Sequence, residues 1–561
     1  MEADEKLNKY ERYKMRKCPY DFFPEIRSLD FENISDADRY YLQDFGIFNA
    51  DFLEGEFTIR IRVPGGRLTA RQFQSIADIV AEHDLHIILT ARAGMQIHGL
   101  YGDNVLEVFD QINALEITTW QSFGDNVRNI VTDIYDGVGE HCEIEAYPII
   151  MQMQEKILKN PRYVGMLPRR ISVGVSGNRA NVVSLFANDL YFALAEKEGT
   201  LGFNVYMGGK NSEIAKDANI FLLKEEVPDF FAAFVETFFI HGLRKSRWKS
   251  RLFHLLEQIG MEQFKEYVQE EYAKPFEPAG KLLLQKEKFT QSQKLKDGTY
   301  AFCYQTDFAR LDVKEITEIA KYATQHDAQI RFGIDQNIYL LGLKEKTLPL
   351  NSPKESATIV ACAGSEYCPF SYWSIKNETV YLPLDKINEH RLQVGFSGCA
   401  KGCGRHQHSD IGLIGLRTNN FGAAEGGARI FLGAEHSGGH SVGRMIFSMV
   451  PLEHLHSLLT LIIQMYEQSG YKDFEEYAGG VLNTYSEDFI ALWLLANTQT
   501  GRAVDLKANS KIAAANEEER FKYEKDLLHE NFAGVDFLEL IEDNFKSVVS
   551  TVSKKLWTIE E

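Results

Sequence analysis

The chain has few of the features that mark secreted or membrane-spanning proteins. It holds only 7 cysteines in 561 residues, and so sparse and odd a number excludes a disulfide-stapled framework. No apolar run reaches the roughly 18 residues that a membrane span needs. The charged N-terminus also lacks the apolar core of a signal peptide. We therefore expect a cytoplasmic protein that has no membrane partner.

Positive charge is scarce as well. The chain has 61 lysines and arginines against 80 aspartates and glutamates, which gives a formal net charge of −19. A dedicated nucleic-acid-binding domain would be basic, so we expect no nucleic-acid partner. A local basic pocket for a small anion remains compatible with this composition, because net charge and local field are separate quantities.

Two sequence units each occur twice along the chain. Residues 170–177 (RISVGVSG) recur as residues 391–398 (RLQVGFSG), and both copies read as a buried strand that enters a glycine-rich turn. A shorter unit that begins at Arg67 recurs at Arg310, and its matches share an offset of 243 residues. It reads as strand, amphipathic helix and strand. The order short, long, short, long predicts a duplicated α+β module with pseudo-two-fold symmetry.

Four of the seven cysteines lie within 42 residues of one another: Cys362, Cys368, Cys399 and Cys403. The first pair needs a loop because a six-residue step would not place both thiols on one helix face. Four thiolates suit either zinc or an iron–sulfur cluster. The spacing favours the cluster, since structural zinc usually takes shorter knuckles, but zinc or no metal remain alternatives. His406 and His408 lie close in sequence and are further candidate ligands.

The cysteine pattern resembles that of the siroheme-containing sulfite and nitrite reductases, and further motifs share this resemblance. They are residues 60–66 (RIRVPGG), 90–92 (TAR), 96–99 (QIHG), 125–129 (DNVRN) and 167–170 (LPRR). The motifs occur in the family's order, and the similarity covers roughly residues 40–490. It implies an α+β fold with the three-lobed architecture of siroheme/4Fe–4S reductases. This architecture is internally duplicated with pseudo-two-fold symmetry and contains ferredoxin-like half-domains.

With this resemblance the chain divides into six predicted segments. They are an N-terminal arm (1–50), a first ferredoxin-like half-repeat (51–150), a first siroheme- and anion-binding α/β domain (151–290), a second ferredoxin-like half-repeat (291–350), a 4Fe–4S- and siroheme-binding α/β domain (351–495) and a C-terminal helical tail (496–561).

The resemblance also implies two cofactors, siroheme and a 4Fe–4S cluster. The four clustered cysteines would hold the 4Fe–4S cluster, and Cys403 would also ligate the siroheme iron. The positions that match the family's anion-binding residues are Arg60, Arg128 and Arg170. The positions that match its siroheme contacts are Arg62, Arg92, Gln96 and His98.

The chemistry of these residues suits the reduction of a small oxyanion. Nitrite to ammonia and sulfite to sulfide each take six electrons, which a cluster coupled to a redox-active macrocycle can deliver singly. Guanidinium groups bind an oxyanion through forked donors and stabilise charge on a departing oxygen. Ser172 stands where lysine is typical of sulfite reductases and asparagine of nitrite reductases, and we include it among the candidate catalytic residues. We favour nitrite as the substrate.

The sequence shows no glycine-rich dinucleotide motif after a strand and no P-loop. We therefore expect electrons from a separate protein, either a ferredoxin or a flavoprotein, and we expect a monomer or weak oligomer. Three alternatives stay open at this point. The chain could act mainly on sulfite, it could bind siroheme as a substrate in the metabolism of that tetrapyrrole, or it could be a non-catalytic duplicated protein with zinc and anion sites.

Overall fold

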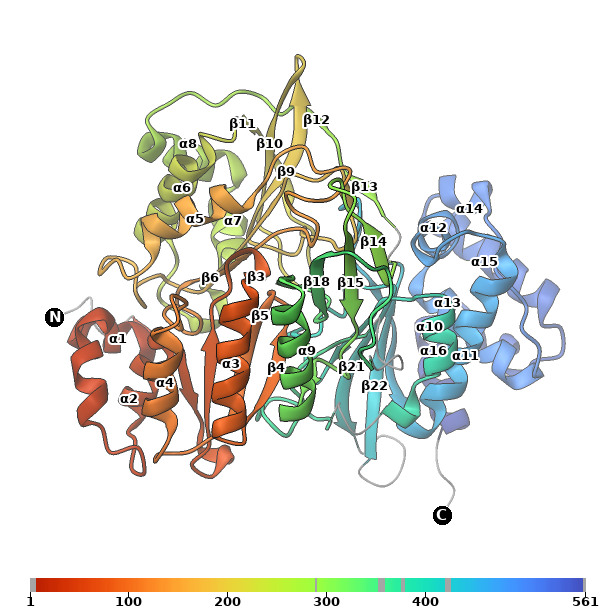
Figure 1. Ribbon diagram of the computed structural model, residues 1–561. Helices are drawn as coiled ribbons and strands as arrows, with labels where there is room; N and C mark the ends of the chain where they lie inside the picture. The colour runs from red at the N-terminus through yellow and green to blue at the C-terminus, as the bar shows by residue number, and fades with distance from the viewer. Residues whose placement is uncertain (1–6, 288–289, 352–358, 375–378, 419–424, 558–561) are drawn as a thin grey trace. The chain divides into compact units, whose positions relative to one another are not determined.

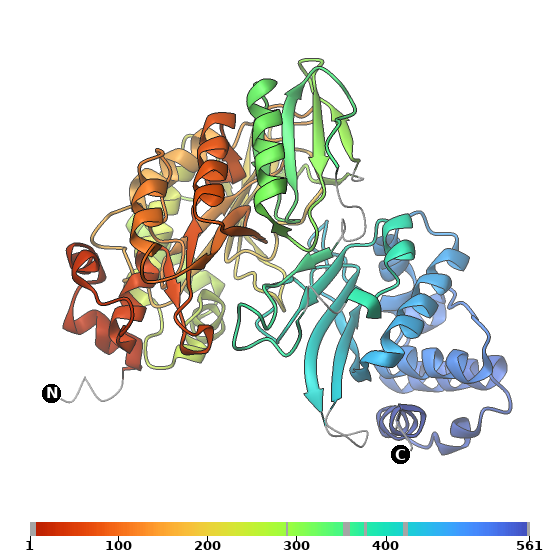
Figure 2. The same ribbon diagram turned by 60° about the horizontal axis from the view of Figure 1, so that its bottom comes forward.

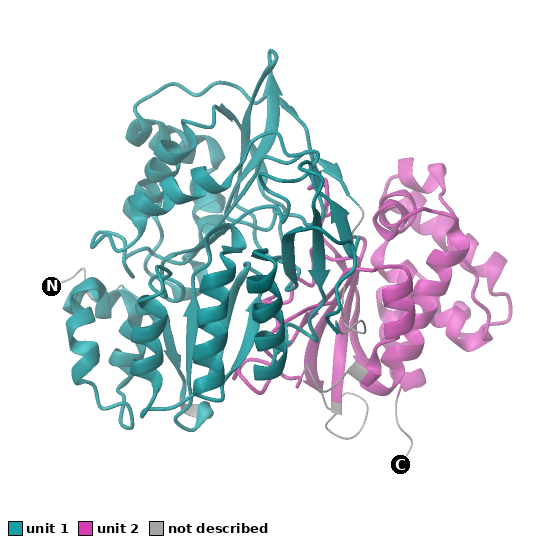
Figure 3. Ribbon diagram, viewed as in Figure 1, with its two compact units in different colours: residues 1–353 teal, residues 354–561 magenta. Residues whose placement is uncertain are grey.

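The structure is a computed structural model, and it describes residues 7–287, 290–351, 359–374, 379–418 and 425–557 (Figure 1). The chain forms two compact units, residues 1–353 and 354–561 (Figure 3). Among the described helices, none combines the length and the apolar character that crossing a membrane would require.

The first unit holds two five-stranded sheets that follow one plan. The first sheet contains, in spatial order, β1 (Ile47–Asn49), β2 (Phe57–Ile61), β5 (Gly94–Leu100), β4 (His86–Thr90) and β16 (Arg310–Leu311). The second contains β14 (Ser292–Lys294), β15 (Tyr300–Tyr304), β18 (Ile338–Leu343), β17 (Gln329–Phe332) and β3 (Arg67–Leu68). The short strands β3 and β16 are exchanged, because each pairs with the sheet of the other repeat. This reciprocal exchange confirms the predicted duplication.

The helices of the short repeats match in length and in their caps. Helix α3 (Ala70–Glu82) starts after a capping box formed by Thr69 and Gln72, and α9 (Val313–Gln325) starts after one formed by Asp312 and Glu315. In both, the N-cap side chain satisfies a backbone N–H that has no partner within the helix. The two helices pack side by side, as Figures 1 and 2 show.

The long repeats form one mixed sheet in each unit. The sheet of the first unit has the order β11 (Lys216–Leu222), β10 (Thr200–Met207), β9 (Leu190–Lys197), β7 (Ile171–Ser176) and β6 (Val127–Val131), with β12 (Lys281–Leu282) beside β9. The sheet of the second unit has the order β19 (Ile359–Ala361), β20 (Val394–Ser397), β21 (Ile411–Thr418), β22 (Glu425–Leu432) and β23 (Arg444–Pro451). In both sheets three neighbouring strands are parallel and the remaining strands antiparallel. The predicted strands at residues 170–177 and 391–398 are thus equivalent central strands.

Further helices complete the two units. In the first unit they are α4 (Val105–Asn113), α5 (Tyr147–Ile157), α6 (Val227–His241), α7 (Leu252–Ile259) and α8 (Met261–Tyr272). In the second they are α10 (Leu384–Glu389), α11 (Leu452–Ser469), α12 (Phe474–Gly480), α13 (Glu487–Thr500), α14 (Ser510–Ala514), α15 (Glu517–Asn531) and α16 (Lys546–Trp557). Strands β6 and β7 are buried along their whole length, which is typical of parallel strands covered on both faces. The polar residues within these strands, Arg128, Asn129 and Ser172, are therefore buried as well.

Both chain ends add helices to this framework. The N-terminal arm contributes α1 (Lys9–Arg16) and α2 (Asp36–Leu42). At the other end, the charged helix α15 contributes a buried carboxylate. Its Glu524 is buried and accepts hydrogen bonds from the backbone N–H and the hydroxyl of Ser486, both at 2.7 Å. Because Ser486 is the N-cap of α13, the tail helix is fastened to the second unit at a helix terminus.

Candidate active site

Four predicted arginines of the first unit lie close enough to influence one another. Arg60 is on β2, Arg128 is on β6, Arg170 directly precedes β7, and Arg92 lies in the turn between β4 and β5. The pKa of Arg128 is lowered well below its usual value, first by burial and then by the positive charges of Arg60, Arg170 and Arg92. Cations gathered this closely repel one another unless an anion joins them.

The contacts of Arg128 leave its positive charge largely uncompensated. Its guanidinium donates to the carbonyl oxygens of Ser122 and Gly124, the latter at 2.9 Å. Its Nε is buried and has no hydrogen-bond partner among the residues that the structure describes. Carbonyl oxygens orient a guanidinium without neutralising it, so this arrangement suits the binding of an anionic group.

Arg60 is held by the same loop. Its guanidinium lies 3.8 Å from the centre of the Phe123 ring, and it donates to the Ser122 carbonyl at 3.4 Å. Stacking on an aromatic face fixes the plane of a guanidinium. The loop between α4 and β6 therefore orients two of the predicted anion-binding residues.

Arg62, predicted to contact siroheme, is enclosed by protein. It is 1% exposed and donates to the Gln154 side chain at 2.5 Å, to the Val127 carbonyl at 2.8 Å and to the Arg128 carbonyl at 3.0 Å. Burial lowers its pKa to about 9. These contacts make Arg62 a support for the backbone that carries Arg128. Its contact with a cofactor stays a prediction.

Gln96 and His98 stand on the neighbouring strand β5. Gln96 pairs across the sheet with Arg60, so their side chains leave the same face. His98 is buried, its Nδ1 lies 3.2 Å from the Thr58 hydroxyl, and its ring is stacked against that of His86. Gln96 is thus placed beside the arginines, whereas His98 has the surroundings of a core histidine.

The turn that carries Arg92 is fixed by a residue that the sequence reasoning gave no role. The Nδ2 of Asn129 donates to the carbonyl oxygens of Val63 at 2.6 Å and of Arg92 at 2.9 Å. Asn129 comes directly after Arg128, so one short stretch of β6 both supplies an arginine and anchors the turn of another. Its place in the DNVRN motif was the only sequence signal for this function.

Ser172 is engaged with a buried aspartate that sequence reasoning also missed. The Ser172 hydroxyl donates to Asp189 Oδ2 at 2.6 Å, and Arg251 lies 2.7 Å from Asp189 Oδ1. Burial alone would raise the pKa of Asp189, but the charges of Arg251 and Arg170 hold it below its ordinary value. Asp189 therefore adds a negative charge beside Arg170, and the role of Ser172 toward substrate stays a prediction.

The four clustered cysteines lie in the second unit at the ends of two parallel strands. Cys362 follows β19, and Cys399 and Cys403 follow β20, its neighbour in the sheet. The backbone N–H groups of Gly398 and Gly364 point at the Cys362 sulfur, at 3.2 and 3.4 Å. The four are among the cysteines without a disulfide partner.

The electrostatics of these thiols show that they are neighbours. Burial raises the pKa of Cys362 to about 12, with the charge of Cys403 as the next cause. Burial likewise raises the pKa values of Cys368 and Cys399, and Cys403 again contributes to both. Four thiolates would repel one another without a metal, and a bound cation reverses that preference. The donor set and its amide N–H groups therefore fit an iron–sulfur cluster.

Glycines make this cysteine loop possible. A side chain at Gly404 would place its Cβ 2.3 Å from the Phe396 carbonyl oxygen, and one at Gly398 would meet the Ser371 side chain. His406 is buried, and its Nδ1 lies 3.0 Å from the Ser397 hydroxyl. Burial lowers its pKa to about 4. These contacts give His406 a role in packing the loop, and the four thiols as metal ligands stay a prediction.

Comparisons with known proteins match residues in each of the two units. The family model described as "Nitrite and sulphite reductase 4Fe-4S domain" matches residues 123–276 and 384–478. The model described as "Nitrite/Sulfite reductase ferredoxin-like half domain" matches residues 53–115. These ranges include Arg60, Arg128 and Arg170 together with Cys399 and Cys403.

Curated relatives align over most of the chain. A ferredoxin–nitrite reductase of Synechococcus elongatus is 28% identical over 501 residues, which cover 82% of this chain and 96% of the relative. The chloroplastic enzyme of Spinacia oleracea is 25% identical over 496 residues, covering 80% and 84%. Among solved structures, the NirA protein of Mycobacterium tuberculosis superimposes with a TM-score of 0.77 at 20% identity, over 86% of this chain and 97% of that one. The expected α+β fold, duplicated and containing ferredoxin-like half-domains, is thereby confirmed.

Proposed function

Because this chain belongs to the family of nitrite and sulfite reductases that use siroheme and a 4Fe–4S cluster, we propose that it reduces nitrite to ammonia. The balanced reaction takes up eight protons and six electrons per nitrite and releases one ammonium ion and two water molecules. The names of the aligned relatives, which are ferredoxin–nitrite reductases, support this choice of substrate.

The observation that carries the proposal is the uncompensated charge of Arg128. Its donors are directed to neutral carbonyls, and its Nε is buried without a hydrogen-bond partner among the described residues. The carboxylate of Asp125 contributes to its electrostatics but is itself matched by Lys14, Arg247 and Arg169. An uncompensated, fixed guanidinium of this kind suits a small anion such as nitrite.

The arginines can act in both binding and catalysis. Siroheme and the cluster, when bound, supply single electrons and an iron atom for the substrate nitrogen. Arg60 and Arg128 would orient nitrite through forked N–H donors. As each N–O bond breaks, negative charge grows on the departing oxygen, and a fixed guanidinium stabilises that charge. The Ser122 carbonyl and the Phe123 ring keep the two guanidinium groups in place without neutralising them.

The surroundings of Arg170 support nitrite over sulfite. Sulfite carries up to two negative charges near neutral pH, whereas nitrite carries one. Ser172, two residues after Arg170, is neutral, and its hydroxyl donates to the buried carboxylate of Asp189. A negative charge beside the pocket disfavours a dianion more than a monoanion.

An external protein must provide the electrons, and a ferredoxin fits best, since the aligned relatives are named for it. We further propose that the protein works in the cytoplasm as a monomer or weak oligomer. Both of these statements rest on the sequence.

The proposal is tested with purified holoprotein, reduced methyl viologen as the donor, and nitrite or sulfite as the acceptor. We expect visible absorption from siroheme, iron with acid-labile sulfide, and ammonium formed from nitrite at a higher kcat/KM than sulfide from sulfite. Stoichiometric zinc without iron would instead identify the cysteines as a structural zinc site.

A further inference from the structure

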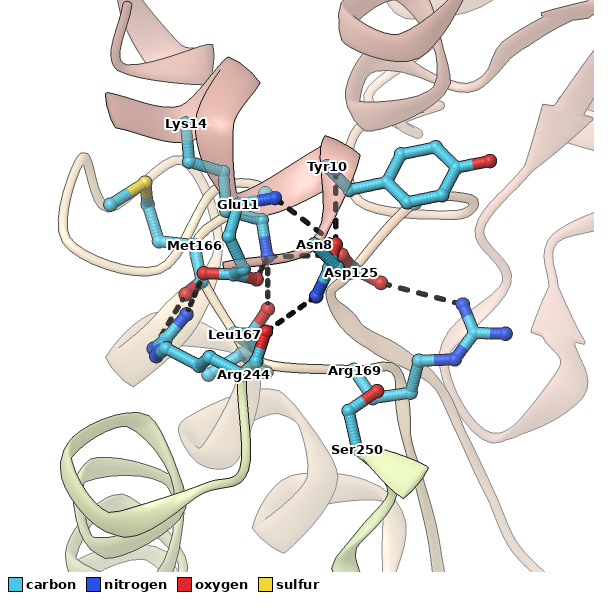
Figure 4. A network of polar contacts seen from close by, with 12 residues as sticks. Asn8, Tyr10, Glu11, Lys14, Asp125, Met166, Leu167, Arg169, Arg244 and Ser250 are labelled. Atoms are coloured by element: carbon cyan, nitrogen blue, oxygen red, sulfur yellow. Dashed lines mark hydrogen bonds and ion pairs between the residues drawn. The ribbon is translucent and has the colours of Figure 1, made fainter. Parts of the chain in front are cut away.

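A buried lysine of the N-terminal arm contacts the two chain segments that precede Arg128 and Arg170. The side chain of Lys14 on α1 is 2% exposed. Its ammonium lies 2.6 Å from the Leu167 carbonyl oxygen, 2.6 Å from Glu11 Oε1 and 3.0 Å from Asp125 Oδ2 (Figure 4). An ammonium has three N–H donors, and here each has an acceptor. This complete pairing allows a charged group to stay buried.

The two chain segments that Lys14 contacts lead directly to Arg128 and Arg170. Asp125 stands three residues before Arg128, and Leu167 stands three residues before Arg170. These segments enter β6 and β7, which are neighbouring parallel strands with Val127 opposite Ile171. Lys14 therefore fastens the starts of both strands to one point, close to where the two arginine side chains depart.

Other cations also hold this network. Arg247 lies beside Asp125 Oδ2, and Arg169 lies 3.7 Å from its Oδ1. Glu11 is also paired with Arg244, at 2.6 Å. Loss of Lys14 would thus leave neither carboxylate without a cation. What would be lost is the contact through the Leu167 carbonyl oxygen. Other links between the two segments would stay, because Asn126 accepts from the N–H groups of Gly165 at 2.7 Å and Ile171 at 3.1 Å, and Arg169 lies beside Asp125.

We propose that Lys14 is a positioning residue for Arg128 and Arg170, because it adds a fully buried link between the segments that carry them and so helps to fix their spacing. The inference rests on the proposed function, because it takes these arginines to bind nitrite. It assigns a function to α1, a helix that lies outside the residues matched by the family models.

The test compares holoprotein carrying Lys14→Met with the wild type and with Lys9→Met. Lys9 is the matched control because it lies on the same helix and forms an exposed ion pair with Asp36. The readouts are the Kd for nitrite, from the change in visible absorption of the resting protein, and the steady-state kcat and KM. All values are normalised to bound siroheme, so that a smaller fraction of folded protein does not change them.

We expect Lys14→Met to weaken nitrite binding and lower kcat/KM by about 10- to 100-fold, the range that a misplacement of about 1 Å can cause. The siroheme and iron contents should stay at the level of Lys9→Met. If Lys14→Met does not fold, Lys14→Gln replaces it, because its amide can still donate to Leu167 without carrying a charge, and a smaller loss in the same direction is expected.

Wild-type affinity and kcat/KM in a Lys14 variant with full siroheme content would overturn the inference. If the proposed function is wrong, the result is different, because the wild-type protein itself would then form no ammonium from nitrite. The nitrite titration would still report whether Lys14 shapes an anion site.

Discussion

Arg60 and Arg128 donate hydrogen bonds to the same carbonyl oxygen, that of Ser122. One residue comes from β2 and the other from β6, and they are 68 positions apart in the chain. A single backbone oxygen thus brings two guanidinium groups to one place. Because that oxygen is neutral, both arginines keep their charge for an anion.

Replacing either arginine should impair turnover and spare the cofactors. We expect Arg128→Ala and Arg60→Ala to lower kcat with nitrite by about 10²–10³-fold, the usual effect of removing one donor at a centre where charge develops. The visible spectrum should stay largely intact. Steady-state assays normalised to siroheme absorption measure this, and unchanged turnover in either variant would remove that residue from the site.

Replacing Arg62 should lower the stability of the protein rather than its turnover, because the N–H donors of Arg62 bind acceptors of the protein itself. Arg62→Met would leave the carbonyl oxygens of Val127 and Arg128 buried without this donor. We expect a loss of about 3 kcal/mol in the free energy of unfolding, since each unsatisfied buried group costs about 1–3 kcal/mol. Chemical denaturation measures the loss. A fully stable variant that has lost siroheme would instead make Arg62 a cofactor ligand.

The preference for nitrite should depend on Asp189. We expect Asp189→Asn to raise the sulfite-to-nitrite ratio of kcat/KM by about tenfold, because it removes a negative charge beside Arg170. Ser172→Lys should act in the same direction by adding a positive charge, whereas Ser172→Ala is the control that changes no charge. If the sulfite-to-nitrite ratio of kcat/KM is unchanged in both Asp189→Asn and Ser172→Lys, and both variants bind siroheme, then Asp189 and Ser172 do not determine the substrate preference.

The stability of the protein should also show the titration of Asp44. Burial raises the pKa of this carboxyl to about 8, and the charge of Asp125 adds to the shift. The pKa of an unfolded aspartate is about 3.9, so the stability that Asp44 contributes is fully present below pH about 4. It is lost as the pH rises through about 8.

Asp44→Asn carries no ionisable group at this position. We therefore expect its melting temperature to fall less than that of the wild type between pH 5 and 8. The exposed Asp36→Asn serves as the control and should follow the wild type. Parallel curves for Asp44→Asn and the wild type would show that Asp44 is not protonated in the native protein.

Much of the architecture could be predicted because the duplicated segments keep their pattern. The strands at residues 170–177 and 391–398 were readable as apolar runs that end in glycine-rich turns, and both occupy equivalent places. The exchange of β3 and β16 could not be predicted, since strands of two residues carry no periodicity. The strands with which β3 and β16 pair are determined by the tertiary fold.

The residues of the candidate site, too, could be predicted only in part. Arginines and cysteines in motifs could be named in advance because their chemistry is distinctive. Lys14 and Asp189 could not, because their functions depend on contacts with residues far along the chain. Lys14 meets Leu167 across 153 positions, and Asp189 meets Arg251 across 62. Nothing in the local sequence of either residue marks such a contact.

The balance of electrons and product tests the central claim most directly. Purified holoprotein is given a limiting amount of nitrite and an excess of a titrated reductant, and both the electrons consumed and the ammonium formed are counted. The account predicts six electrons and one ammonium ion for each nitrite. Protein that binds siroheme and iron yet leaves nitrite unconsumed, or reduces it without forming ammonium, would contradict it.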